Sequence, residues 1–266
     1  ISLTLVLLPV PFQPAKSTDI PERVGFTFLP SGLLVKPLVA NYQEPRVGVR
    51  KQIGSSRLKL DIGSTLDVVE YTISSEKSKR LRVGIDFFTF ALSTSAEGHR
   101  LQIDAVDGFF GGHVSYRVAY DDANLSLRLR ILHLSAHFID GHFDNTTGTW
   151  KGGTLPIPFT KDFGELVGAY EIQFEAMSLL LYSGVSYSTL IRPDDIKRIS
   201  TLHGFEIHTP NNFTNVFGRP LNLFLADHLS LVGIPSYIGT NNLEFGVKFG
   251  EWRGTGVRLY LSYFSG

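Results

Sequence analysis

Two histidines and a serine at alternate positions are the residues of this chain best suited to chemistry. In His133-Leu-Ser135-Ala-His137, the three side chains would share one face of a β-strand. A histidine beside a serine can act as general base for a hydroxyl nucleophile, and an acid or amide can orient the histidine. We therefore predict Ser135 as a candidate nucleophile and His133 as its base. Three nearby groups could orient His133: Asp140, which we take as the first choice, Asp144 and Asn145.

Two other interpretations of these residues stay open. In the first, the histidine and serine side chains lie where a strand leaves an apolar environment, and they hydrogen-bond a loop or the interface. In the second, they belong to a metal site made by His133, His137, Asp140 and His142. The chain has no Cys to support such a site, and the strand would have to break after His137. We predict neither a metal nor any other cofactor.

Period-two alternation of apolar and polar side chains predicts that strands carry these residues. In residues 125–131, leucine or isoleucine alternates with serine or arginine, and His133 and Ser135 continue the apolar face. The same alternation recurs along most of the chain. The opposite, charged face comprises Arg57, Lys59, Asp61, Arg80, Arg82, Asp86, Arg128, Arg130, Glu171 and Glu175.

Composition and strand length predict the fold class. No run of about 18 apolar residues is present, so a transmembrane helix is not available. Several alternating segments extend for about nine to twelve residues, the length that a tilted strand needs to cross hydrocarbon. We predict an all-β fold, a closed antiparallel up-and-down transmembrane β-barrel of about 12 strands. A soluble, secreted β-sandwich shows the same alternation and stays an alternative.

The charged face would then line the lumen of the barrel. Side chains of both signs can pair there, and paired charges would fill the lumen rather than conduct ions, although a small-solute pore is an alternative. Over the whole chain, 25 Lys and Arg balance 25 Asp and Glu, so no basic surface is expected to hold nucleic acid.

The N-terminal residues differ in composition from the alternating strands that follow and set the predicted domain boundary. The opening stretch, residues 1–12, is apolar and similar to the core of a secretion signal. We predict that residues 1–16 are a signal-peptide remnant or an N-terminal tail and that residues 17–266 form one barrel domain. Longer irregular stretches at about 138–167 and 209–220 are candidate extracellular loops.

Two segments carry a resemblance to a bacterial family. They are Pro37-Leu-Val-Ala-Asn-Tyr-Gln-Glu-Pro-Arg46 and Leu127-Arg-Leu-Arg-Ile-Leu-His-Leu-Ser-Ala-His-Phe-Ile-Asp140. The chain resembles the Domain of Unknown Function 1207 family over most of its length, and departs from it at Ala136 and Ile139, where the family tends to have Ser and Gly. The resemblance implies a barrel of the Gram-negative outer membrane and supplies no activity. We predict a structural or binding role there, in contact with outer-membrane lipid and lipopolysaccharide.

The His133-Leu-Ser135 pair is also similar to the His-x-Ser pair of two lipid-cleaving barrels, outer-membrane phospholipase A and lipid A deacylase. Those enzymes carry the pair on the outer wall near the bilayer surface. The likeness implies a lipid or lipopolysaccharide acyl hydrolase as an alternative function. This chain lacks the Asn and Gly pattern that surrounds the pair in both enzymes.

Overall fold

A computed structural model of the chain consists of strands, turns and irregular segments, with no α-helix among the residues that it describes. Those residues are 2–7, 24–73, 79–96, 100–138, 142–150, 155, 157, 159–211, 213–233 and 235–266. The prediction of an all-β chain is confirmed.

The strands differ widely in length. They are β1 (Ser2–Leu7), β2 (Gly25–Phe28), β3 (Val47–Gln52), β4 (Arg57–Thr72), β5 (Lys79–Ala96), β6 (Arg100–Ala119), β7 (Ala123–Phe138), β8 (Phe143–Asp144), β9 (Thr149–Trp150), β10 (Phe159–Gln173), β11 (Ser178–Arg192), β12 (Ile199–His208), β13 (Asn215–Val216), β14 (Arg219–Gly233), β15 (Tyr237–Phe249) and β16 (Val257–Ser265). Part of the predicted signal remnant or tail is thus β1.

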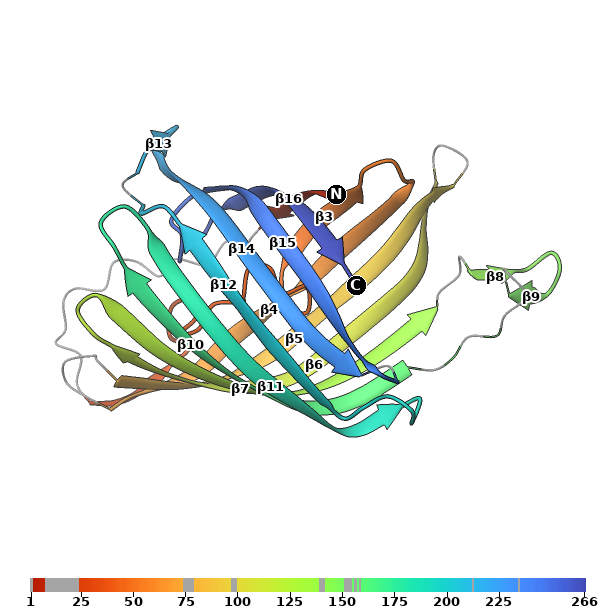
Figure 1. Cartoon of the computed structure of the whole chain (residues 1–266), viewed down its shortest axis with the longest axis horizontal. Coiled ribbons are helices and arrows are strands. Elements are labelled where there is room, and N and C mark those ends of the chain that lie inside the picture. The colour runs from red at the N-terminus through yellow and green to blue at the C-terminus, as the bar shows by residue number, and fades with distance from the viewer. Residues whose placement is uncertain are drawn as a thin grey trace.

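One large antiparallel sheet of fourteen strands contains all of them except β8 and β9, which pair with each other. Its order is β12-β11-β10-β7-β6-β5-β4-β3-β1-β16-β15-β14-β13, and β2 pairs with β4. In addition, β12 pairs with β14, from Thr201 opposite Leu231 to His208 opposite Phe224. Most strands therefore lie beside the strand that precedes them in the chain, as in a series of hairpins (Figure 1).

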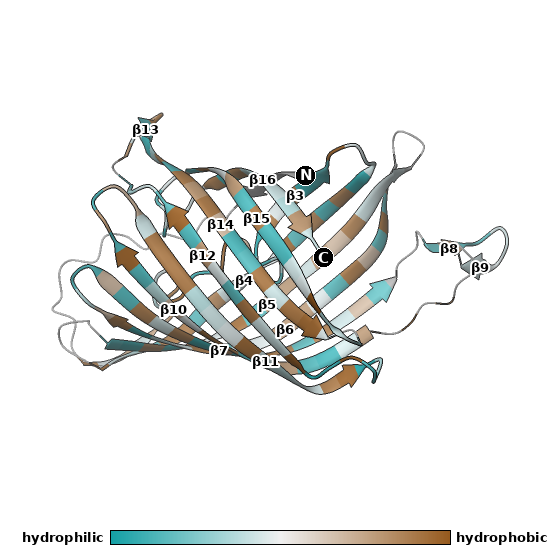
Figure 2. Cartoon of the chain, in the orientation of Figure 1, coloured by the Kyte–Doolittle hydropathy of each residue, from teal (hydrophilic) through white to brown (hydrophobic). Residues whose placement is uncertain are grey.

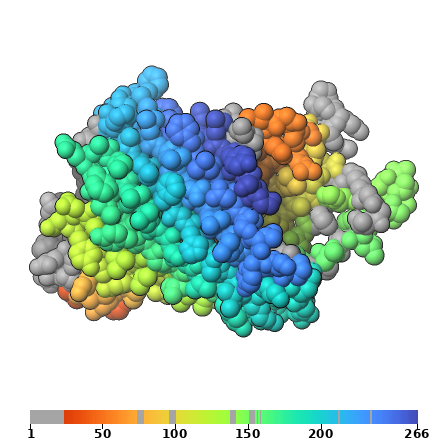
Figure 3. All heavy atoms as spheres, viewed as in Figure 1, coloured from red at the N-terminus to blue at the C-terminus, as the bar shows by residue number. Residues whose placement is uncertain are grey.

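The sheet is strongly curved, and its two faces differ in chemistry. On β7, the convex-face side chains Leu127, Leu129 and Ile131 are 43%, 42% and 68% exposed, whereas Arg128 and Arg130 of the concave face are buried. Figure 2 shows the same alternation of apolar and polar residues along the other strands. Figure 3 shows one stretch of the convex surface, over β11, β12, β14 and β15. The faces follow the period-two pattern of the sequence because successive side chains of a strand point to opposite sides.

Part of the concave face is apolar. A cluster from β5, β6, β7 and β10 comprises Phe88, Phe90, Phe109, Leu132, Leu134 and Phe163. The Phe88 and Phe109 rings stack with centroids 4.6 Å apart. This cluster lies on the concave side near the end of β7 at Phe138 and the start of β10 at Phe159.

Two predicted boundaries were wrong around β10. Residues 159–167, predicted as part of an irregular stretch, belong to this strand. Here the two faces do not separate by polarity, because Lys161 and Phe163 share the concave face while Thr160 and Asp162 lie on the convex face. At its far end the strand stops at Gln173, so the predicted alternation through Glu175 does not continue.

Candidate functional site

The concave face holds a segment of the chain itself, residues 29–46, which we call the interior segment. It follows β2 and precedes β3, and it contains the motif Pro37–Arg46 that carries the family resemblance. Leu34, Leu38, Ala40, Glu44 and Arg46 in this segment are all at most 3% exposed. A stretch without regular secondary structure is rarely buried so completely, because its backbone groups need partners.

The first part of the interior segment is bound by β4 and β5. The Leu34 backbone N–H donates to Asp67 Oδ2 at 2.8 Å. Arg82 Nη1 donates to the Gly32 carbonyl oxygen at 2.9 Å and also contacts Asp67 Oδ2 at 2.9 Å. His113 of β6 binds the second oxygen of Asp67, with Nε2 2.8 Å from Oδ1. One carboxylate thus ties the segment to three neighbouring strands.

A glycine makes room for His113. An added Cβ at Gly84 on β5 would lie 2.4 Å from His113 Cε1 and 2.3 Å from the Leu66 carbonyl oxygen. With no side chain at this position, His113 lies across β5 and places its Nδ1 2.9 Å from Asp86 Oδ2. From β6, the histidine therefore bridges Asp86 of the neighbouring β5 and Asp67 of β4, the strand beyond it.

The middle of the interior segment is bound by concave-face residues of strands β12 and β15, which lie far from β4 and β5 in the order of the sheet. The Val39 N–H donates to Glu206 Oε1 at 2.6 Å, and Asn242 Nδ2 donates to the Ala40 carbonyl oxygen at 2.6 Å. These partners lie on β12 and β15. Apolar side chains add to the contact, because Val39 and Ala40 pack in one buried cluster with Phe224, Ala226 and Tyr260, and Leu38 packs in another with Val167, Ala169, Tyr182 and Leu202.

Glu44 neutralises two buried arginines of β7. Arg128 Nη1 donates to its Oε2 at 3.1 Å, and Arg128 Nη2 contacts Oε1. Arg130 Nη1 lies 3.3 Å from Glu44 Oε2, and Arg130 Nη2 lies 2.7 Å from Glu165 Oε1 on β10. Two arginines and two carboxylates thus form a buried network with balanced charge, in which each guanidinium has an anionic partner.

Arg46 ends the interior segment with a second set of polar contacts. Its Nη1 donates to the Tyr260 hydroxyl at 3.3 Å and lies 3.6 Å from Glu244 Oε1, while Nη2 donates to the Asn41 carbonyl oxygen. Arg46 therefore closes a loop within the segment and ties it to β15 and β16. Taken together, the contacts of the interior segment reach strands all along the sheet.

The structure places most of the predicted charged residues on the concave face. Asp61, Arg82, Asp86, Arg128, Arg130 and Glu171 are buried, and Lys59 and Arg80 are half-buried. Arg57 is exposed at the start of β4, and Glu175 is exposed in the turn that follows β10. Sequence reasoning missed Glu44 and Arg46, although both stand in the motif Pro37–Arg46, because that motif has no strand period to assign it a face.

A different cluster lies on the convex face. His133 Nδ1 is 2.6 Å from Asp162 Oδ1, and the two side chains are 33% and 48% exposed. The residues are direct partners in the register of β7 and β10. The His133 ring also packs against Phe110 of β6, with centroids 4.7 Å apart. His133 is therefore held from both neighbouring strands.

Ser135 is the next residue of β7 on the convex face. It is half-buried, lies opposite Thr160 of β10 and follows His133 at a spacing of two residues. The Thr160 hydroxyl donates to the Leu134 carbonyl oxygen at 2.9 Å. Histidine and aspartate are thus in contact across two paired strands, and the serine lies on the same face two residues from the histidine. These are the residue types that activate a serine hydroxyl.

The predicted orienting groups differ from the one observed. Asp140 lies outside the described residues. Asp144 Oδ1 accepts the backbone N–H of Thr146 at 2.8 Å in the β8–β9 hairpin, and this bond lowers the pKa of its carboxyl. Asn145 follows it in the same turn. Asp162 was missed because it was assigned to an irregular stretch.

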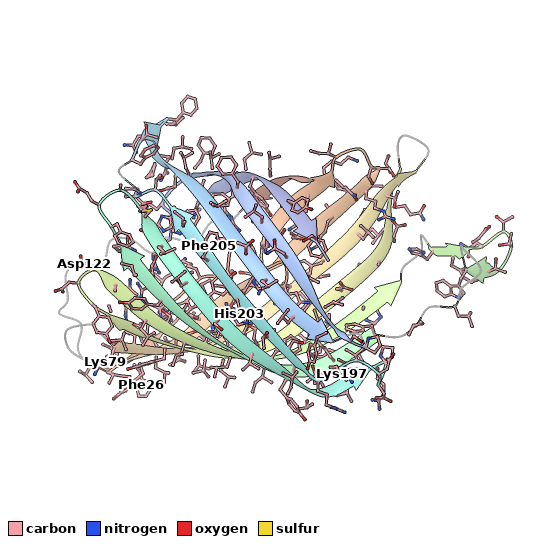
Figure 4. All side chains as sticks on the ribbon, viewed as in Figure 1. Phe26, Lys79, Asp122, Lys197, His203 and Phe205 are labelled. Atoms are coloured by element: carbon pink, nitrogen blue, oxygen red, sulfur yellow. The ribbon has the colours of Figure 1, made fainter. Side chains whose placement is uncertain are left out.

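A second serine and histidine pair also lies on the convex face. Ser183 Oγ of β11 is 2.9 Å from His203 Nδ1 of β12, its direct partner in the register. Figure 4 shows His203 and, two residues further along β12, Phe205. In this pair the Nδ1 atom faces serine, whereas in His133 it faces a carboxylate.

Comparisons give no direct guide to function. No family model, no curated protein and no solved structure matches this chain. The resemblance to the Domain of Unknown Function 1207 family thus stays a prediction. Within the part of the chain that the structure describes, no three or more His, Asp or Glu side chains are grouped to hold a metal ion. Over the same residues, no helix is long and apolar enough to cross a membrane.

Proposed function

We propose that this chain is a membrane-spanning β-barrel of the Gram-negative outer membrane, closed on itself and filled by its own interior segment, with a structural or binding role. The observation that carries the proposal is the pairing of β12 with β14. With that pairing, each strand of the described sheet apart from the short β2 and β13 has a partner on both edges. Twelve strands would then form a ring, and a ring has no free edge.

The distribution of apolar residues supports a lipid environment. Large apolar side chains lie exposed across the convex face, among them Phe87 at 69%, Ile131 at 68% and Phe245 at 58%. Soluble proteins rarely expose a continuous apolar surface of this extent. A β-sandwich would bury its apolar face between two sheets, whereas here charged residues are enclosed and apolar residues face outward. Strands β4 to β7 have 16 to 20 residues, enough to cross hydrocarbon when tilted.

The contents of the concave side favour a filled barrel over a small-solute pore. The interior segment runs along it and is bonded to β4, β5, β7, β12, β15 and β16. A cavity beside Tyr42, Lys161 and His228 has a volume of about 50 Å³. That space holds a few water molecules. Many of the buried charges are paired with one another, as Glu44 is with Arg128 and Arg130. A paired charge attracts a passing ion little.

Closure can be tested with engineered cysteines, because the chain has none. Thr201→Cys and Leu231→Cys, which are opposite each other on β12 and β14, should form a disulfide under mild oxidation. The control combines Thr201→Cys with Leu223→Cys, roughly 26 Å further along β14 by strand rise, and should not cross-link. Equal cross-linking in both variants, or none in the first, would contradict closure.

Membrane insertion and filling need two further measurements on the same protein. We expect an outer-membrane fraction whose band on SDS gels shifts on heating, as closed barrels often do. In planar bilayers the protein should carry no stepwise ion current. A periplasmic protein without a heat shift would refute the barrel, and steady current steps would refute the filled lumen.

A further inference from the structure

The convex face brings three reactive groups together where β7 ends and β10 begins. His133 and Ser135 lie close to the end of β7 at Phe138, and Asp162 lies close to the start of β10 at Phe159. Register pairs His133 with Asp162, and their side chains meet at 2.6 Å. Ser135 lies two residues further along the same face of β7, about 6.6 Å away by strand rise.

The geometry points to a serine hydrolase site that cleaves fatty acyl esters of membrane lipids, with Ser135 as nucleophile, His133 as general base and Asp162 as the group that orients His133. This inference rests on the proposed function, since it requires the convex face to meet lipid. The catalytic pair is the one expected from the spacing of His133 and Ser135. The orienting residue is Asp162 in place of Asp140.

The position of Asp162 decides which nitrogen of His133 can act. A carboxylate at Nδ1 keeps the proton on that atom, so that Nε2 carries the lone pair that accepts a proton. Nε2 takes the proton of the Ser135 hydroxyl as Oγ attacks the acyl carbonyl carbon. The ester C–O bond breaks, and His133 passes the proton to the departing alcohol oxygen. Water, deprotonated by His133, then attacks the acyl carbon. The bond to Ser135 Oγ breaks, His133 returns the proton to Oγ, and the fatty acid is released.

The surroundings of the cluster suit a lipid ester. On one side lie exposed apolar residues of the same face, Ile131 at 68%, Phe110 at 52% and Leu166 at 47%. On the other side β7 ends at Phe138 and β10 begins at Phe159. Acyl ester groups of a bilayer lie at the boundary between the hydrocarbon and the headgroups. A lipid that enters laterally would place its ester bond beside Ser135 and its acyl chain along the apolar wall.

A purely structural role explains the cluster less well. A charged side chain facing lipid is destabilising unless it lies near the interface. The register of β10 with β7 depends on backbone pairing and does not require a carboxylate at position 162. The contact that the Asp162 carboxylate makes with β7 is the one with His133. The Ser183–His203 pair offers a direct comparison because it has the same two residue types with a different histidine orientation.

The test uses the full chain folded into vesicles of dioleoylphosphatidylcholine, with purified lipopolysaccharide as a second substrate. We expect release of fatty acid from at least one of these two substrates. The substrate that is cleaved identifies the class of lipid. Ser135→Ala and His133→Ala should lower the rate by at least about 10³-fold, and Asp162→Asn by about 10²-fold or more. Ser183→Ala is the matched control and should retain the full rate.

A fluorophosphonate that modifies activated serines provides a readout that does not depend on substrate. It should label Ser135 in the wild type, more slowly in Asp162→Asn and not in His133→Ala, as located by peptide mass analysis. A heat-modifiable wild-type protein that neither releases fatty acid nor reacts at Ser135 would overturn the triad and leave the barrel intact. Labelling of Ser135 in a protein without the heat shift would overturn the barrel and the lipid substrate, leaving an activated serine.

Discussion

Replacing Glu44 by Gln should destabilise the protein strongly, because it leaves two buried arginines short of negative charge. The Glu44 side chain is 0% exposed, and those of Arg128 and Arg130 are 6% and 1% exposed. Removing one partner of a buried ion pair costs about 3–5 kcal/mol. Glu165 still lies 2.7 Å from Arg130 and 3.7 Å from Arg128, so its carboxylate continues to neutralise part of their positive charge in the variant. We therefore expect the free energy of unfolding to fall by about 3 kcal/mol, the lower end of this range.

The assay is equilibrium unfolding in urea of the protein in detergent micelles, followed by tryptophan fluorescence. Trp252 reports on the interior, because it stacks on His208 with centroids 4.3 Å apart and packs against the cluster that contains Val39 and Ala40. A loss of about 3 kcal/mol lowers the folding equilibrium constant by about 150-fold. The slope of the free energy against urea should stay unchanged if the variant keeps its fold.

The control is Asp194→Asn, which removes the acid of an exposed pair. The side chains of Arg192 and Asp194 are 53% and 72% exposed. Solvent screens such a pair, and its loss should change the free energy of unfolding by less than about 1 kcal/mol. An equal effect of Glu44→Gln and Asp194→Asn would refute the reasoning, because it would mean that water reaches Glu44 and that the interior segment is not enclosed.

Two further predictions concern the concave side and its interior segment. Replacing residues 32–43 by a Gly/Ser linker of the same length should turn an electrically silent protein into one that conducts ions in steps across planar bilayers. A heat-modifiable variant that carries no current would contradict the role of this segment in filling the lumen. Gly84→Ala should lower the free energy of unfolding by about 1–3 kcal/mol, because the new Cβ would displace His113. Gly168→Ala is the control, since its nearest neighbour would be Leu127 Cδ2 at 3.5 Å; equal losses in the two variants would contradict the packing of His113.

The strands and the chemistry of their faces were predictable because both depend on local side-chain alternation. Leu127 and Arg128 reveal their opposite faces by position alone. The interior segment was not predictable in the same way. Its residues lack a period, and their partners are distant in sequence: Leu34 bonds Asp67, whereas Ala40 bonds Asn242. Such contacts follow from how the sheet curves, which no local pattern records.

The candidate catalytic site was predictable only in part. The spacing of His133 and Ser135 identified them as neighbours on one face, because alternate residues of a strand share it. Their partner was sought near them in the chain, at Asp140, Asp144 or Asn145. The structure pairs His133 with Asp162 instead. The stretch around Asp162 has charged residues on both faces, Lys161 on the concave face and Asp162 on the convex face, and so it did not match the pattern used to find strands.

The central claim is that the convex face lies in lipid, and a spin label on single cysteines tests it most directly. Ile131→Cys places the label on the apolar wall, and Phe217→Cys places it in the turn before β14, where the native side chain is fully exposed. In vesicles, we predict that the label at position 131 collides with oxygen and not with a water-soluble nickel chelate, while the label at position 217 does the opposite. Equal access of the nickel chelate to both labels would contradict a membrane-spanning barrel.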